Sequence, residues 1–293
     1  MMKKRAAAFA LISLVGGSLW IVRQMVTGPG DQLRVSAAAY LLSALILSSL
    51  LLFLKIPKPE RSAVASNLVL GVTLVACPLL FTMWAASHVS PGLAAIIPAA
   101  TPLVVTYFCD GLWRARNAAI AGLAGVILLF ADIVSFYTGQ WTGVVALLVA
   151  LMATAGSLVF AKKKLTQSHP IFSAAVELAT AGVVLEAASI LFGGQGGALL
   201  TSLWVPIICI SAGVCVMYPL YFWLLQRIRP DQLASVVWAQ LLVSIMEGVL
   251  LVRPHIPFRM ILGAAVIGGA LAFLGQAEPE NKLLTVRVTP RPR

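Results

Sequence analysis

The amino-acid sequence predicts an all-α integral membrane protein whose ten transmembrane helices form two inverted five-helix repeats. Three observations carry this prediction: an apolar composition, ten separate apolar runs, and a weak internal repeat. Of the 293 residues, 60% are hydrophobic and 11% are charged, and the mean hydropathy is +0.96. Soluble globular proteins carry about 25% charged residues, so the composition argues against a water-soluble enzyme.

The ten apolar runs are separated by charged, proline or glycine residues, and each can cross a bilayer, which takes about 20 residues of helix. Lipid offers no hydrogen-bond partner to free backbone groups, so each run is expected to be helical. The first run exceeds the apolar core of a signal peptide, about 7–15 residues, and is predicted to be an uncleaved helix. The expected spans are residues 6–26, 35–54, 66–87, 92–112, 117–137, 141–161, 171–192, 203–226, 232–252 and 259–276.

Basic residues predict the orientation, because cytoplasmic loops carry an excess of Lys and Arg. Seventeen of the 21 basic residues lie in one alternating set of gaps and three in the other, with Arg23 inside a span. Both termini are therefore expected in the cytoplasm, in a multi-pass protein of the cytoplasmic (inner) or plasma membrane. This topology explains the net charge of +11. The expected partner is therefore the lipid bilayer, and nucleic acid is not expected to bind.

An internal repeat predicts how the spans are grouped. Ser-Pro-Gly-Leu-Ala-Ala at 90–95 resembles Arg-Pro-Asp-Gln-Leu-Ala-Ser at 229–235, and each is followed by an acid-glycine pair and a Gly/Ala-rich span. Five crossings are an odd number, so the second copy must be inverted, as in many transporters. The predicted units are residues 1–137 and 138–276, followed by a disordered cytoplasmic tail at 277–293. The Gly/Ala-rich spans are expected to be packing faces or the contact of a homodimer.

Four segments resemble the drug/metabolite transporter superfamily, specifically its ten-helix EamA-type members. They are GGSLW (16–20), AASHVSPGLAAIIPAATPLVVTYF (85–108), GVVALLVALMATAGSLVFAKKKL (143–165) and YPLYFWLLQRIRPDQLASVVWAQLLVSIMEGVLL (218–251). The sequence departs from the family where Trp113-Arg114 and Arg253-Pro254 stand in place of a usual Gly-Glu pair. The resemblance implies a secondary active transporter, often an exporter of amino acids, related metabolites or amphipathic drugs, that works by alternating access without ATP.

Ionisable residues within membrane spans are costly and suggest function. The candidates for coupling to protons are Glu247, Asp132, Glu177 and Glu186, with Glu247 preferred because the resemblance places span nine beside the substrate cavity. Arg23 is a candidate for binding an anionic substrate group or for pairing with an acid. The alternative is that these residues form structural ion pairs or reach the membrane surface.

A second set of candidates is uncharged. The resemblance places these side chains on spans that build the family's cavity, where aromatic residues with polar tips suit an amphipathic substrate. Ordinary packing is the alternative for each. Prolines at 78, 98, 102, 206 and 219 interrupt helical hydrogen bonding and are expected to kink their helices. The candidate substrate contacts, beside Arg23, are Trp20, Trp84, Tyr107, Tyr218, Tyr221, Trp238 and Gln240.

The sequence contains no recognisable catalytic or cofactor site. The three histidines lie in predicted loops with no acid or cysteine at ligand spacing, and the four cysteines lie in apolar runs without CxxC spacing, so neither a metal nor a disulfide is expected. No Walker A, G-x-S-x-G or H-E-x-x-H motif occurs. We therefore expect no enzyme activity and no cofactor.

Two alternatives to a metabolite exporter stay open. The first is a carrier of phosphorylated or lipid-linked sugars or nucleotide-sugars. The phosphate groups of such substrates would require more cations in the cavity than Arg23 alone. The second is a membrane scaffold subunit that transports nothing. The identity of the small-molecule substrate, the direction of transport and the coupling ion do not follow from the sequence.

Overall fold

The computed structural model describes residues 2–26, 28–55, 61–109, 113–131, 134, 139–165, 168–191, 203–252 and 258–275. The regular structure in these ranges is helical, and they contain no strand. The helices are α1 (Met2–Gln24), α2 (Pro29–Phe53), α3 (Arg61–Leu70), η1 (Gly71–Ala76), α4 (Cys77–Ala86), α5 (Pro91–Ala99), α6 (Thr101–Phe108), α7 (Trp113–Phe130), α8 (Trp141–Lys164), α9 (Pro170–Leu191), α11 (Trp204–Leu225), α12 (Pro230–Ala234), α13 (Val236–Val252) and α14 (Phe258–Gly275).

The ten predicted spans coincide with helical segments. Nine stretches of the described chain are long and apolar enough to cross a membrane, and Phe258–Leu274 is a shorter apolar helix. The all-α, multi-pass fold class is therefore confirmed. Several helices begin before the apolar run does: α7 starts at Trp113 rather than near residue 117, because the basic residues at its start are good helix formers.

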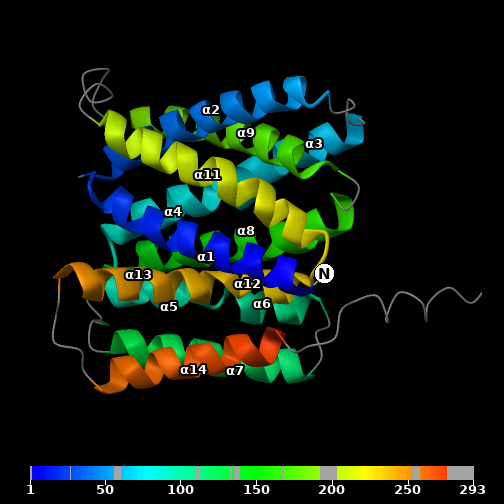
Figure 1. Cartoon of the computed structure of the whole chain (residues 1–293). Helices are drawn as coiled ribbons and strands as arrows, with labels where there is room; N and C mark the ends of the chain where they lie inside the picture. Colours follow the sequence, from blue (N-terminus) through cyan, green and yellow to red (C-terminus); the bar gives the residue numbers. More distant parts are fainter. Residues whose placement is uncertain are drawn as a thin grey trace, which may run out of the picture.

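Two pairs of helices form opposite edges of the bundle (Figure 1). α2 packs along α9 at one edge, and α7 packs along α14 at the other. A Cβ atom at Gly125 of α7 would lie 2.9 Å from the carbonyl oxygen of Gly263 of α14, and one at Gly263 would lie 2.8 Å from the carbonyl oxygen of Gly125. The two Gly/Ala-rich spans therefore pack against each other through their backbones, as small residues allow, and a homodimer stays a prediction.

Contacts between the remaining helices recur when the two halves are exchanged. α1 contacts α11 and α13, and α8, its equivalent in the second half, contacts α4, α5 and α6. Likewise α2 contacts α11, and α9, its equivalent in the second half, contacts α3 and η1 of span three, the equivalent of α11. This is the pattern expected from an inverted duplication. The predicted boundary between residues 137 and 138 and the tail at 277–293 lie outside the described residues, so the division into units stays a prediction.

The helix that begins the described chain and the helix that ends it meet at one end of the bundle. α1 starts beside the N-terminus, and α14 finishes at that same end (Figure 1). We call this the N-terminal end and the other the far end. An even number of crossings requires this arrangement, whereas its placement in the cytoplasm is still a prediction.

Candidate functional site

Span three contains a π-helical turn beside Glu177. The Cys77 N–H donates to the carbonyl of Val72, five residues earlier, and Pro78 directly follows with no N–H of its own. A Cβ atom at Gly71, at the start of this turn, would lie 2.8 Å from the carbonyl oxygen of Glu177 on α9. Single π turns inside α-helices often occur at functional sites, and this one packs directly on the backbone that carries Glu177.

Span four is discontinuous, because α5 ends at Ala99 and α6 begins at Thr101. Pro102 has no N–H, and the carbonyl of Pro98 accepts instead from the Thr101 hydroxyl at 2.6 Å. The Leu103 N–H donates to Ala100 rather than to Ala99. Because of the break, the Ala99 carbonyl accepts its hydrogen bond from a group outside its own helix.

Trp238 supplies that partner. Its indole Nε1–H donates to the Ala99 carbonyl at 2.8 Å, and the side chain is fully buried. A Cβ atom at Gly122 of α7 would collide with its ring. The sequence predicts Trp238 as a substrate contact, but in this structure its one polar atom holds the break in span four.

Span nine is discontinuous too, with α12 ending at Ala234 and α13 beginning at Val236. No proline lies at this break. Instead the Ser235 hydroxyl donates to the Gln232 carbonyl at 2.7 Å, a local bond of the kind that competes with helical pairing. Broken helices in corresponding positions of the two halves are typical of transporter binding regions.

A buried polar cluster forms where α1, α2, α9 and α11 meet. We define it by the side chains of Arg23, Tyr40, Glu177, Tyr218 and Tyr221. Arg23 Nη2 donates to Tyr40 Oη at 2.9 Å, and Tyr40 is 2% exposed. The buried Nε of Arg23 has no hydrogen-bond partner among the described residues. The cluster therefore contains a guanidinium with donor capacity left over.

Glu177 is the acidic member of the cluster. Its residue is 0% exposed, and neither carboxylate oxygen has a hydrogen-bond partner among the described residues. An ionised carboxylate out of water costs several kcal/mol unless it is paired, and a buried polar group without a partner in a folded protein calls for an explanation. This carboxyl is placed to take up a proton or to accept a hydrogen bond from a bound molecule.

The tyrosines connect the acidic and basic members. The Tyr218 ring lies 6.4 Å from the Tyr40 ring in an edge-on arrangement. Tyr218 is within electrostatic range of both Arg23 and Glu177, and Tyr221 is within range of Glu177. Arg23 and Tyr40 come from residues 1–137, and the other three from residues 138–276. The cluster therefore spans the two halves.

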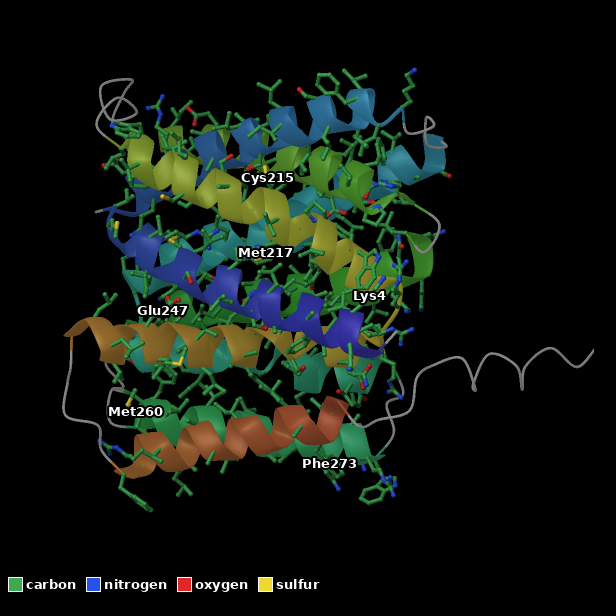
Figure 2. The ribbon with its side chains drawn as sticks, viewed as in Figure 1. Lys4, Cys215, Met217, Glu247, Met260 and Phe273 are labelled. Atoms are coloured by element: carbon green, nitrogen blue, oxygen red, sulfur yellow. The ribbon has the colours of Figure 1, made fainter. Side chains whose placement is uncertain are left out.

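Glu247 lies elsewhere, in a polar contact between α1 and α13 (Figure 2). The Ser18 hydroxyl donates to Glu247 Oε1 at 2.5 Å, and the Ser244 hydroxyl donates to the Gly17 carbonyl at 2.9 Å. A Cβ atom at Gly17 would lie 2.7 Å from Val243. In this structure the preferred coupling candidate joins α1 to α13 toward the far end.

The other polar candidates have partners of their own. Gln240 Nε2 lies 3.9 Å from Met217 Sδ, and its side chain fills the space beside Gly16 of α1. Glu186 pairs with Arg34 at 3.2 Å between α9 and α2. This is the structural ion pair that the alternative interpretation predicts. Asp132 lies outside the described residues.

Three of the predicted aromatic contacts lie away from the cluster. Tyr107 is 80% exposed and Trp20 is 44% exposed, and both are among the apolar side chains at the bundle surface. Trp84 stacks on His88 with 4.3 Å between the ring centroids. The structure thus brings together Arg23, Glu177, Tyr218 and Tyr221 of the predicted set.

Sequence reasoning left Tyr40 out of the candidate set. Its signals are a phenol that follows three alanines in an apolar span and a position, early in span two, where EamA-type members often carry a basic residue; neither was used to name it as a site residue. No group of three or more His, Cys, Asp or Glu residues in the described part of the chain is arranged to hold a metal ion. The cluster combines one cation, one acid and three phenol hydroxyls.

Comparison with solved structures supports the fold. Twenty-eight chains of known structure are similar to this one. One crystal structure of a protein matches with a TM-score of 0.72 and 17% sequence identity, over 92% of this chain and 99% of that chain. At this identity the likeness shows the fold alone. A search of curated proteins finds no significant sequence match.

The sequence of the second half matches the model of the EamA-like transporter family over residues 141–276. The match begins at the start of α8 and ends one residue beyond α14, so it contains Glu177, Tyr218 and Tyr221. The match shows an EamA-like transporter family domain in the second half of the chain, and the helical spans of the bundle make the chain a multi-pass membrane protein.

Proposed function

We propose that the protein is a secondary active transporter that exports small carboxylate-bearing metabolites, amino acids among them, by proton-linked alternating access. The observation that carries the proposal is that one buried cluster contains both an arginine with an unused donor and a glutamate with no hydrogen-bond partner among the described residues. Both halves contribute to this cluster, as expected of a carrier that binds its substrate between its repeats.

Arg23 is the proposed contact for the substrate carboxylate. A guanidinium presents a planar set of donors that matches a carboxylate, and one of these donors, Nε, is unused within the described part of the chain. The rings of Tyr218 and Tyr221 present apolar bodies with polar tips, which suit an amphipathic side chain or drug. The substrate class is therefore a small anion or zwitterion with an apolar part.

Glu177 is the proposed proton carrier. A buried carboxyl that is neutral in one state of the carrier and ionised in another links proton movement to substrate movement. The other candidates support this role less well, because Glu247 accepts from Ser18 and Glu186 pairs with Arg34. The choice of Glu177 over Glu247 rests on these contacts.

Alternating access is supported by the helices around the cluster. Spans four and nine are broken, and span three carries a π turn next to Glu177. Such irregular segments are places where a helix can change direction at low cost. The α1–α13 contact that Ser18 and Glu247 make is the proposed closure at the far end, on the side of the membrane opposite the termini.

The two alternatives gain less support. A phosphorylated sugar or nucleotide-sugar would need several cations, and the charged neighbours of Tyr218 in the cluster are Arg23 and the acidic Glu177. A scaffold subunit has no use for a fully buried acid that lacks a hydrogen-bond partner in the described part of the chain, because such an acid lowers stability unless it serves another purpose.

Flux in proteoliposomes tests the proposal. Radiolabelled amino acids and amphipathic amines are screened with the purified protein, with and without a pH gradient. For a transported amino acid we expect Arg23→Gln to raise KM about tenfold or more, because a hydrogen bond to a charged group contributes about 1.5–3 kcal/mol.

Arg34→Gln is the matched control, since it removes an arginine that pairs with Glu186 outside the cluster, and its KM should stay within about threefold of the original. Zero flux across the panel would favour the scaffold alternative. An unchanged KM in Arg23→Gln would remove Arg23 from the site.

A further inference from the structure

An open recess of about 650 Å³ lies at the N-terminal end of the bundle, apart from the buried polar cluster. One wall is the face of α1 from Lys4 to Leu11, and the other is the face of α11 from Pro219 to Arg227 just beyond it. The start of α9, at Pro170 and Ile171, forms the floor. The recess is therefore a wedge between two helices at a membrane boundary.

The walls are apolar. Ala7 and Leu11 line the α1 side, and Leu220 and Trp223 line the α11 side. The spacings of four residues on α1 and three on α11 place each pair on one face of its helix. Leu11 is 40% exposed, so apolar surface is open toward the bilayer at this level. A hydrocarbon chain is the complement of such a lining.

The rim carries positive charge. Lys4 and Arg227 both line the recess, and no acidic residue is among its lining side chains in the described part of the chain. The guanidinium of Arg227 lies 4.2 Å from the Trp223 ring centroid and donates to the Trp223 carbonyl at 2.9 Å, which fixes it at the edge of the apolar wall. Figure 2 shows Lys4 on the facing end of α1.

Backbone dipoles add to this field. The floor is the N-terminal end of α9, which favours negative charge. At the C-terminal end of α11, where the dipole is negative, Lys162 Nζ donates to the carbonyls of Leu225 at 3.0 Å and Ile228 at 2.9 Å. The negative end beside the recess is thus covered by a cation, and the positive end faces it.

We propose that this recess binds an anionic phospholipid, with its phosphate between Lys4 and Arg227 and an acyl chain along the apolar walls. The ligand class follows from the combination of an apolar wedge that opens to lipid and a basic rim at the level of the head groups, the arrangement by which basic pockets between membrane helices bind acidic lipids. A zwitterionic lipid would fit the walls equally well but not the rim.

Quenching of tryptophan fluorescence by brominated lipid tests the proposal. The full chain is placed in phosphatidylcholine nanodiscs, and brominated phosphatidylglycerol or brominated phosphatidylcholine is titrated in. Quenching at the recess is measured as the difference in quenching between the unchanged protein and Trp223→Phe. We expect it to saturate at lower mole fraction with phosphatidylglycerol. Replacing both charges, Lys4→Gln with Arg227→Gln, should weaken the apparent affinity about 25-fold, at roughly fivefold per charge.

Two further variants separate charge from shape. Arg114→Gln is the matched control, because Arg114 also lies over a tryptophan, Trp113, at 5.7 Å but outside the recess. The apparent affinity of this variant for phosphatidylglycerol should stay unchanged. Ala7→Phe keeps every charge, fills the wedge and should abolish the preference. Equal quenching by the two lipids, or an equal loss in Arg114→Gln, would overturn the proposal. Competition by inorganic phosphate would identify a site for a free anion and overturn it too.

Discussion

Glu177→Gln is expected to remove the dependence of substrate flux on a pH gradient while leaving exchange of substrate for substrate in place. Glutamine keeps the size and the hydrogen-bonding oxygen of the side chain but cannot release a proton. The ratio of fluxes with and without the gradient should therefore fall to about one. The measurement is uptake into proteoliposomes whose internal pH is set independently.

The control lies on the same helix. Glu186→Gln also neutralises an acid of α9, but that acid is partly exposed and paired with Arg34, so its flux should keep the pH dependence of the unchanged protein. If Glu247→Gln lost the pH dependence and Glu177→Gln kept it, proton coupling would belong to the α1–α13 contact and our assignment would be wrong.

Trp238→Ala is expected to cause a larger loss of stability than a change at any other candidate residue. Removing a fully buried tryptophan costs about 3–5 kcal/mol through the cavity it leaves. The same change strips the Ala99 carbonyl of its donor, and a buried acceptor without a partner adds a cost of about 1–3 kcal/mol. The free energy of unfolding in mixed detergent micelles, followed by circular dichroism, measures the sum.

Two related variants divide this effect. Trp238→Phe fills most of the volume but lacks the indole N–H, so it should show mainly the hydrogen-bond part, about 1–3 kcal/mol. Trp20→Ala removes a tryptophan that is largely at the surface and should change stability by less than about 1 kcal/mol. A loss in Trp238→Ala no larger than that in Trp20→Ala would show that the break in span four does not depend on Trp238.

The fold was predictable because it depends on properties that each segment carries alone. An apolar run of sufficient length must be helical in lipid whatever it packs against, so ten runs give ten helical segments. The helix limits were less predictable, as at Trp113, because a helix can extend through charged residues beyond the membrane. The break at Ser235 has no proline that would have predicted it, and it depends on a local hydrogen bond from the Ser235 hydroxyl to the Gln232 carbonyl.

The candidate site was predictable only in part, because it depends on which helix faces meet. Arg23 and Glu177 were singled out since charge inside a span is rare, and charge is visible in the sequence. Tyr40 was missed because its importance arises from Arg23, which reaches it from another helix. Trp238 was predicted as a substrate contact and Glu247 as a coupling residue. The groups that contact their polar atoms in this structure, on Ala99 and Ser18, come from distant parts of the chain and could not be read from the sequence.

Accessibility of the buried polar cluster from both sides of the membrane tests the central claim most directly. In a chain with Cys77, Cys109, Cys209 and Cys215 replaced by alanine, Tyr221→Cys is treated with a membrane-impermeant thiol reagent, in intact cells and in inverted vesicles. Ser87→Cys and Lys164→Cys, at exposed positions on opposite ends of the bundle, calibrate each side. Alternating access predicts that the cysteine at 221 is modified from both sides, whereas each calibration cysteine reacts from one. Modification of position 221 from a single side, or from neither, would contradict the account.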